Sequence, residues 1–163
     1  MRTLLRSFVM CAVIFTFTAA PFNSAAADGD HDDQKVIVVK LTLGMDGDKK
    51  RRFHPAKLNF ERSKRYRLVI SNPSLEVHEF DSPGFVEAVW SSHVNVRDGY
   101  EKGAQTVATI VGTPAEIEIV PGGSVEWEFV PVAAGQYEMV CDTKDQAGKT
   151  HTASGMRGTI LVK

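Results

Sequence analysis

Apolar and polar residues alternate along much of the chain from Val36 onward, and this pattern predicts β-strands. The clearest example is a late hairpin in which Ile117 and Ile119 alternate with glutamates before a Pro121-Gly122-Gly123 turn. After the turn, apolar and polar positions alternate again from Ser124 to Phe129. One face is apolar and the other carries glutamates, as in an antiparallel sheet with one side in water. The residues predicted to be buried are Val125, Trp127, Phe129 and Tyr137.

Further extended segments are predicted on both sides of this hairpin, at residues 36–43, 58–61, 65–71, 77–80, 85–90, 135–141 and 159–162. Turns are expected at Asp46-Gly47, Asn72-Pro73 and Ser82-Pro83-Gly84. Short strands at this spacing indicate an all-β sandwich or barrel. The segment from Ser91 to Thr113 fits no strand pattern well, and we expect a short helix or a long connecting loop there.

The N-terminal residues are expected to lie outside this domain. Arg2 and Arg6 precede an uncharged apolar stretch and an Ala25-Ala26-Ala27 site, the order found in secretory signal peptides. We therefore predict a signal peptide over 1–27, a disordered acidic leader over 28–35 and one domain over 36–163. Lipidation at Cys11 is the less favoured alternative, because Met10 is bulky for that processing. No other stretch is apolar enough to span a membrane, so the mature form is expected to have no transmembrane segment. The signal peptide predicts that the mature form is periplasmic or otherwise exported after cleavage near Ala27.

Charge excludes one class of function and leaves another question open. The chain has 19 Lys and Arg against 20 Asp and Glu, which argues against nucleic acid as a partner. Basic residues concentrate between 49 and 67, and glutamates between 116 and 138. These are either two solvated strand faces or opposed patches that steer a docking partner.

Cys141 is the sole cysteine of the predicted mature chain. It is a buried inert thiol, a metal ligand, a nucleophile or half of an intermolecular disulfide. His151 and Met156 follow it in a polar loop before the last strand, and thiolate, imidazole and thioether are donors that suit copper. His78, on an earlier short strand, is placed to complete a His₂Cys site with a weak axial Met. A cysteine nucleophile is less favoured because nothing in the sequence suggests an oxyanion site, and zinc because Met serves it poorly.

Several motifs in residues 53–163 resemble the cupredoxin family of type 1 copper proteins. They are Phe53-His54-Pro55, His78-Glu79-Phe80, Pro121-Gly122-Gly123-Ser124-Val125, Gly135-Gln136-Tyr137 and Gly155-Met156-Arg157-Gly158-Thr159. The resemblance implies a Greek-key antiparallel β-sandwich that holds one copper ion per chain. It assigns His78, Cys141 and His151 as equatorial ligands, Met156 as the axial ligand and Tyr137 as a corner tyrosine.

The chain departs from the family pattern in two places. Nine residues, Asp142 to Thr150, separate Cys141 from His151, where the family usually has only a few. This loop bulges outward and leaves the site closed, or it opens the site or supplies a carboxylate ligand such as Asp142 or Asp145. We expect the closed form, because Gly148 and its polar neighbours allow the loop to turn in water. The second departure is Glu79, whose charge follows the first histidine.

The function expected from these features is one-electron transfer by an exported carrier that docks transiently with a redox protein. The alternative is copper tolerance or delivery, with a copper-handling protein as the partner. A mono-copper enzyme is a lower-ranked reading, because an enlarged loop can open a coordination position. His54 and His93 are expected to play no part in the site.

Overall fold

The computed structural model describes residues 35–45 and 48–163. The predicted signal peptide at 1–27, nearly all of the predicted leader and the predicted Asp46-Gly47 turn lie outside the described residues. No helix among the described residues is long and apolar enough to cross a membrane.

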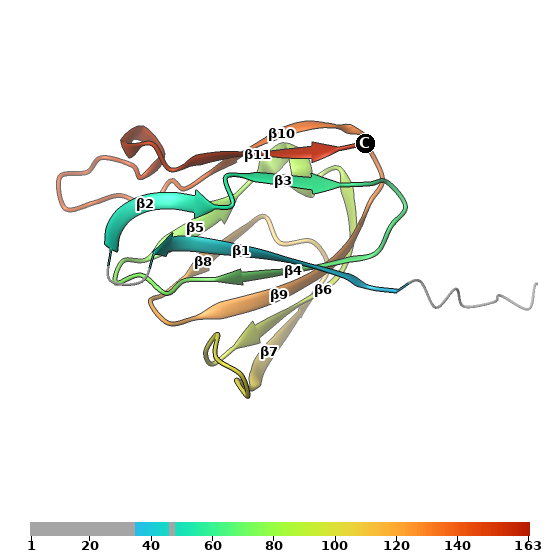
Figure 1. The fold of residues 1–163 in the computed structure, drawn as a ribbon, viewed down its shortest axis with the longest axis horizontal. Helices are drawn as coiled ribbons and strands as arrows, with labels where there is room; N and C mark the ends of the chain where they lie inside the picture. The colour runs from blue at the N-terminus through green and yellow to red at the C-terminus, as the bar shows by residue number, and fades with distance from the viewer. Residues whose placement is uncertain (1–34, 46–47) are drawn as a thin grey trace, which may run out of the picture. The chain divides into compact units, whose positions relative to one another are not determined.

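Two β-sheets pack face to face as a sandwich (Figure 1), which confirms the predicted fold class. The first sheet has the strand order β2-β1-β4-β9-β6-β7, with β2 Asp48–His54, β1 Ile37–Met45, β4 Tyr66–Ser71, β9 Ser124–Pro131, β6 Val89–Arg97 and β7 Thr106–Val111. The second has the order β3-β11-β10-β5-β8, with β3 Lys57–Phe60, β11 Arg157–Val162, β10 Gly135–Val140, β5 His78–Asp81 and β8 Glu116–Ile119.

Most neighbouring strands are antiparallel, as predicted, but each sheet also contains one parallel pair. β1 lies parallel to β4, with Ile37 opposite Tyr66, and β3 lies parallel to β11, with Leu58 opposite Ile160. Parallel neighbours are joined by crossovers rather than by tight hairpins. They therefore pair segments far apart in the chain, which the alternation pattern alone does not reveal.

The core between the sheets is rich in aromatic side chains. Trp127 and Phe129 of β9 are buried as predicted, and so is Val125. Phe85 packs edge-on against Trp127 and Phe129, with ring centroids 5.8 and 5.3 Å away, in the geometry that aromatic pairs prefer. Tyr137 is only partly buried, and its hydroxyl donates a hydrogen bond to the Ala133 carbonyl over 3.2 Å.

The outer face of β9 is less exposed to solvent than predicted. Glu128 is only 4% exposed, because two arginines of the neighbouring region lie over it. Arg65 Nη2 and Arg67 Nη2 contact its two carboxylate oxygens at 2.9 and 2.6 Å. These bonds outweigh burial and lower the pKa of Glu128.

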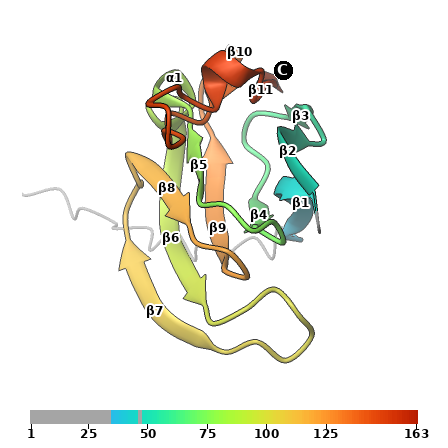
Figure 2. The same cartoon turned by 90° about the vertical axis from the view of Figure 1, so that its left-hand side faces the viewer.

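Three predictions about the chain are wrong. The strands at 116–119 and 124–129 do not form the predicted hairpin, because β8 pairs with β5 in the second sheet whereas β9 pairs with β4 and β6 in the first. The segment 91–113 is not a helix or an irregular loop, because it forms most of the β6–β7 hairpin (Figure 2). Every residue of β7 is exposed, so no buried face imposed an alternation on its sequence. The extended segment predicted at 85–90 is also wrong at its start, because Phe85 and Val86 belong to a single helical turn, α1 (Pro83–Val86). Pro83 suits the first position of this turn.

Candidate metal centre

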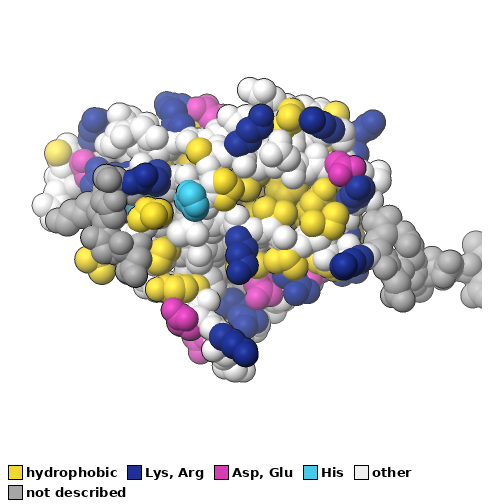
Figure 3. Space-filling model, in the orientation of Figure 1, with side chains coloured by type: hydrophobic (Ala, Val, Ile, Leu, Met, Phe, Trp, Pro, Cys, Tyr) yellow, Lys and Arg dark blue, Asp and Glu magenta, His cyan; other side chains and the backbone are white. Residues whose placement is uncertain are grey.

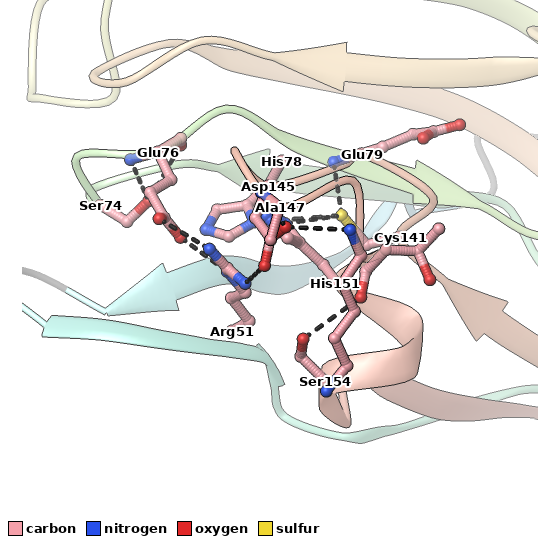
Figure 4. Close-up of polar contacts among 12 residues, drawn as sticks. Arg51, Ser74, Glu76, His78, Glu79, Cys141, Asp145, Ala147, His151 and Ser154 are labelled. Atoms are coloured by element: carbon pink, nitrogen blue, oxygen red, sulfur yellow. Dashed lines mark hydrogen bonds and ion pairs between the residues drawn. The ribbon is translucent and has the colours of Figure 1, made fainter.

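Three segments of the chain bring one side chain each to the same end of the sandwich. His78 is the first residue of β5, Cys141 directly follows β10, and His151 precedes the 3₁₀ turn η1 (Thr152–Ser154). The strands β5 and β10 are neighbours in one sheet. All three side chains are at least 98% buried, and Figure 4 shows their polar atoms turned toward one another.

The donor atoms of these residues form a tight triangle. The two Nδ1 atoms of His78 and His151 are 3.1 Å apart, and Cys141 Sγ lies 4.0 and 3.4 Å from them respectively. In a flat triangle, donors at about 2.0 Å (nitrogen) and about 2.3 Å (sulfur) from an ion lie about 3.5 to 3.7 Å apart. The observed separations bracket these values, so the group fits one metal ion.

Hydrogen bonds fix Cys141 within this triangle. The backbone N–H of Glu79 donates to Sγ over 3.2 Å. The Thr152 hydroxyl accepts from the Cys141 N–H and donates to the Cys141 carbonyl, both over 2.9 Å. Thr152 directly follows His151, so these bonds also tie the segments of two candidate ligands to each other.

Burial sets the protonation of the three side chains. Burial and the neighbouring His151 lower the pKa of His78 to about 4. Burial, and then the charge of Arg51, also lower the pKa of His151. Both imidazoles are therefore neutral near pH 7 and offer a lone pair to a metal. Burial raises the pKa of the Cys141 thiol, while the Glu79 N–H partly opposes that rise.

Glu79 acts on Cys141 more through its backbone N–H than through its charge, which adds slightly to the raised pKa of the thiol. Its carboxylate points away from the Cys141 sulfur (Figure 4) and accepts the Asp142 N–H over 3.2 Å. Burial, followed by a hydrogen bond with Glu116, raises the pKa of Glu79 to about 7. The side chain is therefore partly neutral near pH 7.

The long loop between Cys141 and His151 folds as a narrow hairpin of its own. Lys144 and Thr150 form a β-bridge, and the Asp145 carboxylate accepts the backbone N–H groups of Ala147 and Lys149, each over 2.9 Å. Gly148 takes the positive φ of 78° that the turn needs. The metal group found among the described residues contains two histidines and one cysteine and no carboxylate.

Arg51 of β2 ties this loop to the rest of the site, which the sequence analysis missed. Its guanidinium donates to both oxygens of Glu76 at 2.9 and 3.0 Å and to Asp145 at 3.0 Å. Glu76 lies two residues before His78, and Asp145 lies in the loop before His151. Arg51 therefore links the segments that precede both histidines. The sequence offered only a basic run, 49–52, that looks like a solvated strand face.

Gly44 is a second residue whose importance only the structure reveals. Its φ is +69°, and a Cβ built there would lie 2.8 Å from His78 Nε2 and 2.7 Å from Ser74 Cβ. Any side chain would collide with the imidazole. From the sequence, Gly44 is merely the end of a strand.

The other residues considered in the sequence analysis are Met156, His54 and His93. Met156 is fully buried one turn beyond His151, and its backbone N–H donates to the His151 carbonyl over 3.0 Å. Its role as an axial ligand stays a prediction. His54 and His93 lie outside the metal group, and His93 Nδ1 is 2.9 Å from the Ser92 hydroxyl.

A hollow of about 580 Å³ adjoins the site on the side of the long loop. His151 lines it together with Arg51, Glu76 and residues 143–147 of the loop. Its walls therefore carry both charge signs. His151 borders this hollow although the residue is only 2% exposed.

Comparison with known proteins identifies the fold. No protein family model matches the chain, and no curated protein sequence does. Among solved structures, a laccase from Pediococcus acidilactici matches 80% of this chain and 28% of its own, at 16% identity and a TM-score of 0.57. The multicopper oxidase McoA from Aquifex aeolicus matches 81% of this chain and 30% of its own, at 14% identity and a TM-score of 0.55.

A multicopper oxidase from Campylobacter jejuni gives a third match, at 14% identity and a TM-score of 0.52 over 78% of this chain and 30% of its own. The chain thus spans less than a third of the length of each of these proteins. At these identities the likeness concerns the fold alone, and it establishes a cupredoxin-like β-sandwich.

Proposed function

We propose that this chain is a one-electron carrier that binds one copper ion through His78, Cys141 and His151, with Met156 as a weak axial ligand. The observation that carries the proposal is the buried triangle of two imidazole nitrogens and one sulfur, 3.1 to 4.0 Å apart. Neutral imidazole and thiolate in a trigonal array, with a thioether nearby, are the donors of blue-copper electron-transfer sites. Bound copper would accept and release one electron as it changes between its two oxidation states.

The protein's contribution is to keep the donors in place whatever the charge at the site. Cys141 and His151 are joined through Thr152, His78 stands on a strand, and Arg51 links the segments that precede both histidines. Donors held this firmly rearrange little when the charge between them changes. Small rearrangement favours fast electron transfer over capture and release of the metal.

Two finer parts of the proposal concern location and partners. We propose that the chain is exported after cleavage near Ala27, which rests on the sequence of residues 1–27. The partner is a redox protein that docks transiently. In the view of Figure 3, Lys and Arg side chains are spread over the surface with fewer acidic ones among them, and a basic face favours an acidic partner.

The test is the absorption spectrum of the copper-loaded protein, with substitutions at the site. The chain should bind one copper and show an intense thiolate-to-copper band, which Cys141→Ser should abolish. Met156→Leu should retain copper and shift the reduction potential, because the axial bond is weak. His93→Gln is the matched control, since His93 lies outside the triangle, and it should change neither property. An unchanged spectrum and copper affinity in Cys141→Ala would refute the proposal.

A second candidate, copper handling or mono-copper catalysis, is favoured by the hollow beside His151. Such a hollow gives a small molecule a route toward the metal. Azide added to the oxidised, copper-loaded protein distinguishes the two functions. An unchanged absorption and electron paramagnetic resonance spectrum fits a closed carrier site. A saturable shift would favour the second candidate over electron transfer.

A further inference from the structure

Two threonines flank the candidate metal centre, and their hydrogen bonds differ completely. The Thr152 hydroxyl makes two, both to the backbone of Cys141 over 2.9 Å. The Thr143 hydroxyl makes none, and among the described residues its Oγ1 is the only buried side-chain oxygen or nitrogen atom without a partner. Nearly all buried polar groups in folded proteins are hydrogen-bonded, because an unpaired one has lost its bonds to water and gained nothing in return. The unpaired Thr143 hydroxyl therefore calls for a physical reason.

Thr143 stands between two of the candidate ligands. It is the second residue after Cys141, and its backbone carbonyl accepts the N–H of His151 over 2.9 Å. Burial raises the pKa of the Cys141 thiol, whereas the Glu79 N–H and then the hydroxyl and N–H of Thr143 lower it. The hydroxyl acts on this pKa because it lies near the sulfur. It is therefore a neighbour of the sulfur without being hydrogen-bonded to it.

The Cys141 sulfur is also the atom near Thr143 whose bonding capacity changes most when a metal binds. A protonated thiol is a weak acceptor, but a metal-bound cysteine is a thiolate and accepts charge-assisted hydrogen bonds. Water is a poorer explanation for the unpaired hydroxyl. Thr143 borders the hollow beside His151, yet its Oγ1 atom is itself buried, so water in the hollow does not reach it.

We propose that the Thr143 hydroxyl donates a hydrogen bond to the Cys141 thiolate that forms when the site takes up its metal. Thr143 is then a positioning residue, which holds the sulfur from the long loop while the Glu79 N–H holds it from β5. The hydroxyl hydrogen turns about the C–O bond, so it can be aimed at the sulfur once the sulfur is a strong acceptor. The unpaired hydroxyl destabilises the metal-free protein, and metal binding removes that penalty.

This hydrogen bond has a consequence for electron transfer, which rests on the proposed copper function. A donor to the thiolate withdraws electron density from the sulfur, so the sulfur donates less to the metal. The oxidised ion depends on that donation more than the reduced ion does, and the hydrogen bond therefore raises the reduction potential. Because Thr143 belongs to the loop between Cys141 and His151, the long loop then helps to set the potential.

Cadmium, a redox-inactive ion that binds thiolates, tests the hydrogen bond without the copper function. Thr143→Val removes the hydroxyl and keeps the shape of the side chain, so the metal-free variant should unfold at the wild-type temperature or above it. Its rise in unfolding temperature on adding Cd²⁺ should be smaller than that of the wild-type protein, and Thr143→Ser should restore the rise. Thr152→Val is the matched control. Its hydroxyl is already bonded, so its loss should lower the unfolding temperature even without metal.

The copper-loaded protein gives the second measurement. Thr143→Val should lower the reduction potential and move the thiolate-to-copper band to longer wavelength, and Thr143→Ser should stay close to the wild-type protein. The proposal is overturned if Thr143→Val lowers the unfolding temperature of the metal-free protein, because the hydroxyl would then already have a partner. An unchanged rise with Cd²⁺ would overturn it as well. If only the copper measurements fail, the hydrogen bond stands and the proposed function is at fault.

Discussion

The loop between Cys141 and His151 and the β6–β7 hairpin are opposites in sequence and in environment. The loop is polar, contains no run of regular structure beyond one β-bridge, and is held by its own hydrogen bonds and by Arg51. In the hairpin, four of the six residues of β7 are apolar, yet every residue of this strand is exposed. Hydropathy would assign the first segment to solvent and the second to the core.

The difference shows that partners, rather than hydropathy, decide how firmly a segment is held. Asp145 alone satisfies two backbone N–H groups of the loop and an arginine from β2. The apolar side chains of β7 are exposed, so they gain little from the hydrophobic effect. Pairs of matched substitutions, one in each region, measure this difference.

The largest contrast is expected between two glycines with positive φ. Gly44→Ala would place a Cβ 2.8 Å from His78 Nε2, whereas a Cβ at Gly103 in the β6–β7 loop meets nothing within 4 Å. Both substitutions carry backbone strain of about 1 to 3 kcal/mol. Only Gly44→Ala should also displace His78, weaken copper binding and alter the spectrum. Copper titration followed by absorption checks this, and equal effects of the two substitutions would contradict the close packing around His78.

The next contrast concerns two arginines. Arg51→Met removes charged hydrogen bonds to Glu76 and Asp145 and should lower the free energy of unfolding by about 1 to 2 kcal/mol. It should also loosen the loop and let azide perturb the copper spectrum. Arg97→Met is the control. Arg97 bonds Thr106, Ala104 and Glu126 near the hairpin, away from the metal group, so the spectrum should not change. If Arg51→Met leaves the azide response of the wild-type protein unaltered, Arg51 does not brace the site.

A third prediction uses the pH dependence of stability on the outer face of β9, between the two regions. Hydrogen bonds from Arg67 and Arg65 outweigh burial and lower the pKa of Glu128. The stabilisation is therefore present above the unfolded-state pKa of about 4.3 and is lost as the pH falls through the lower folded-state value. The effect is modest because both arginines are over a third exposed and are screened by water.

Urea unfolding at pH 7 and at acid pH measures this contribution. Glu128→Gln should remove part of the acid-induced loss of stability seen in the wild-type protein. Glu126→Gln, at the more exposed position on the same face, should remove less of it. Identical pH profiles for the wild-type protein and Glu128→Gln would show that the arginines contribute nothing.

The smallest effect is expected on β7 itself. Val111 is 85% exposed, so Val111→Thr should change the free energy of unfolding by less than about 0.5 kcal/mol at low protein concentration. The same substitution at Val125, which is 5% exposed, buries a hydroxyl and should cost about 1 to 3 kcal/mol. Thermal unfolding of the two variants checks the pair. A large loss in Val111→Thr would mean that a partner covers β7 even in dilute solution.

The sequence by itself determined the strands that have one wet and one buried face. The strands β8 and β9 each alternate because each turns one face toward the core, so the burial of Val125, Trp127 and Phe129 was predictable. That the two strands lie in different sheets was not. The types of donor and their order along the chain were equally visible. Cys141 at a strand end, a histidine and methionine after it and His78 before it identify a candidate copper site before any geometry is known.

Tertiary structure alone decided what depends on neighbours that are distant in the chain. It made β7 a strand through its backbone pairing with β6 and set β1 parallel to β4. It also placed Arg51, which the sequence shows only as a charge on a strand, between Glu76 and Asp145. It packed the His78 ring so close to Gly44 that no side chain fits at that position. The alternation of apolar and polar residues shows only which side chains face water and which face the core. The residue types show only what each side chain can bind. Which residues meet across the sandwich is a property of the packed chain.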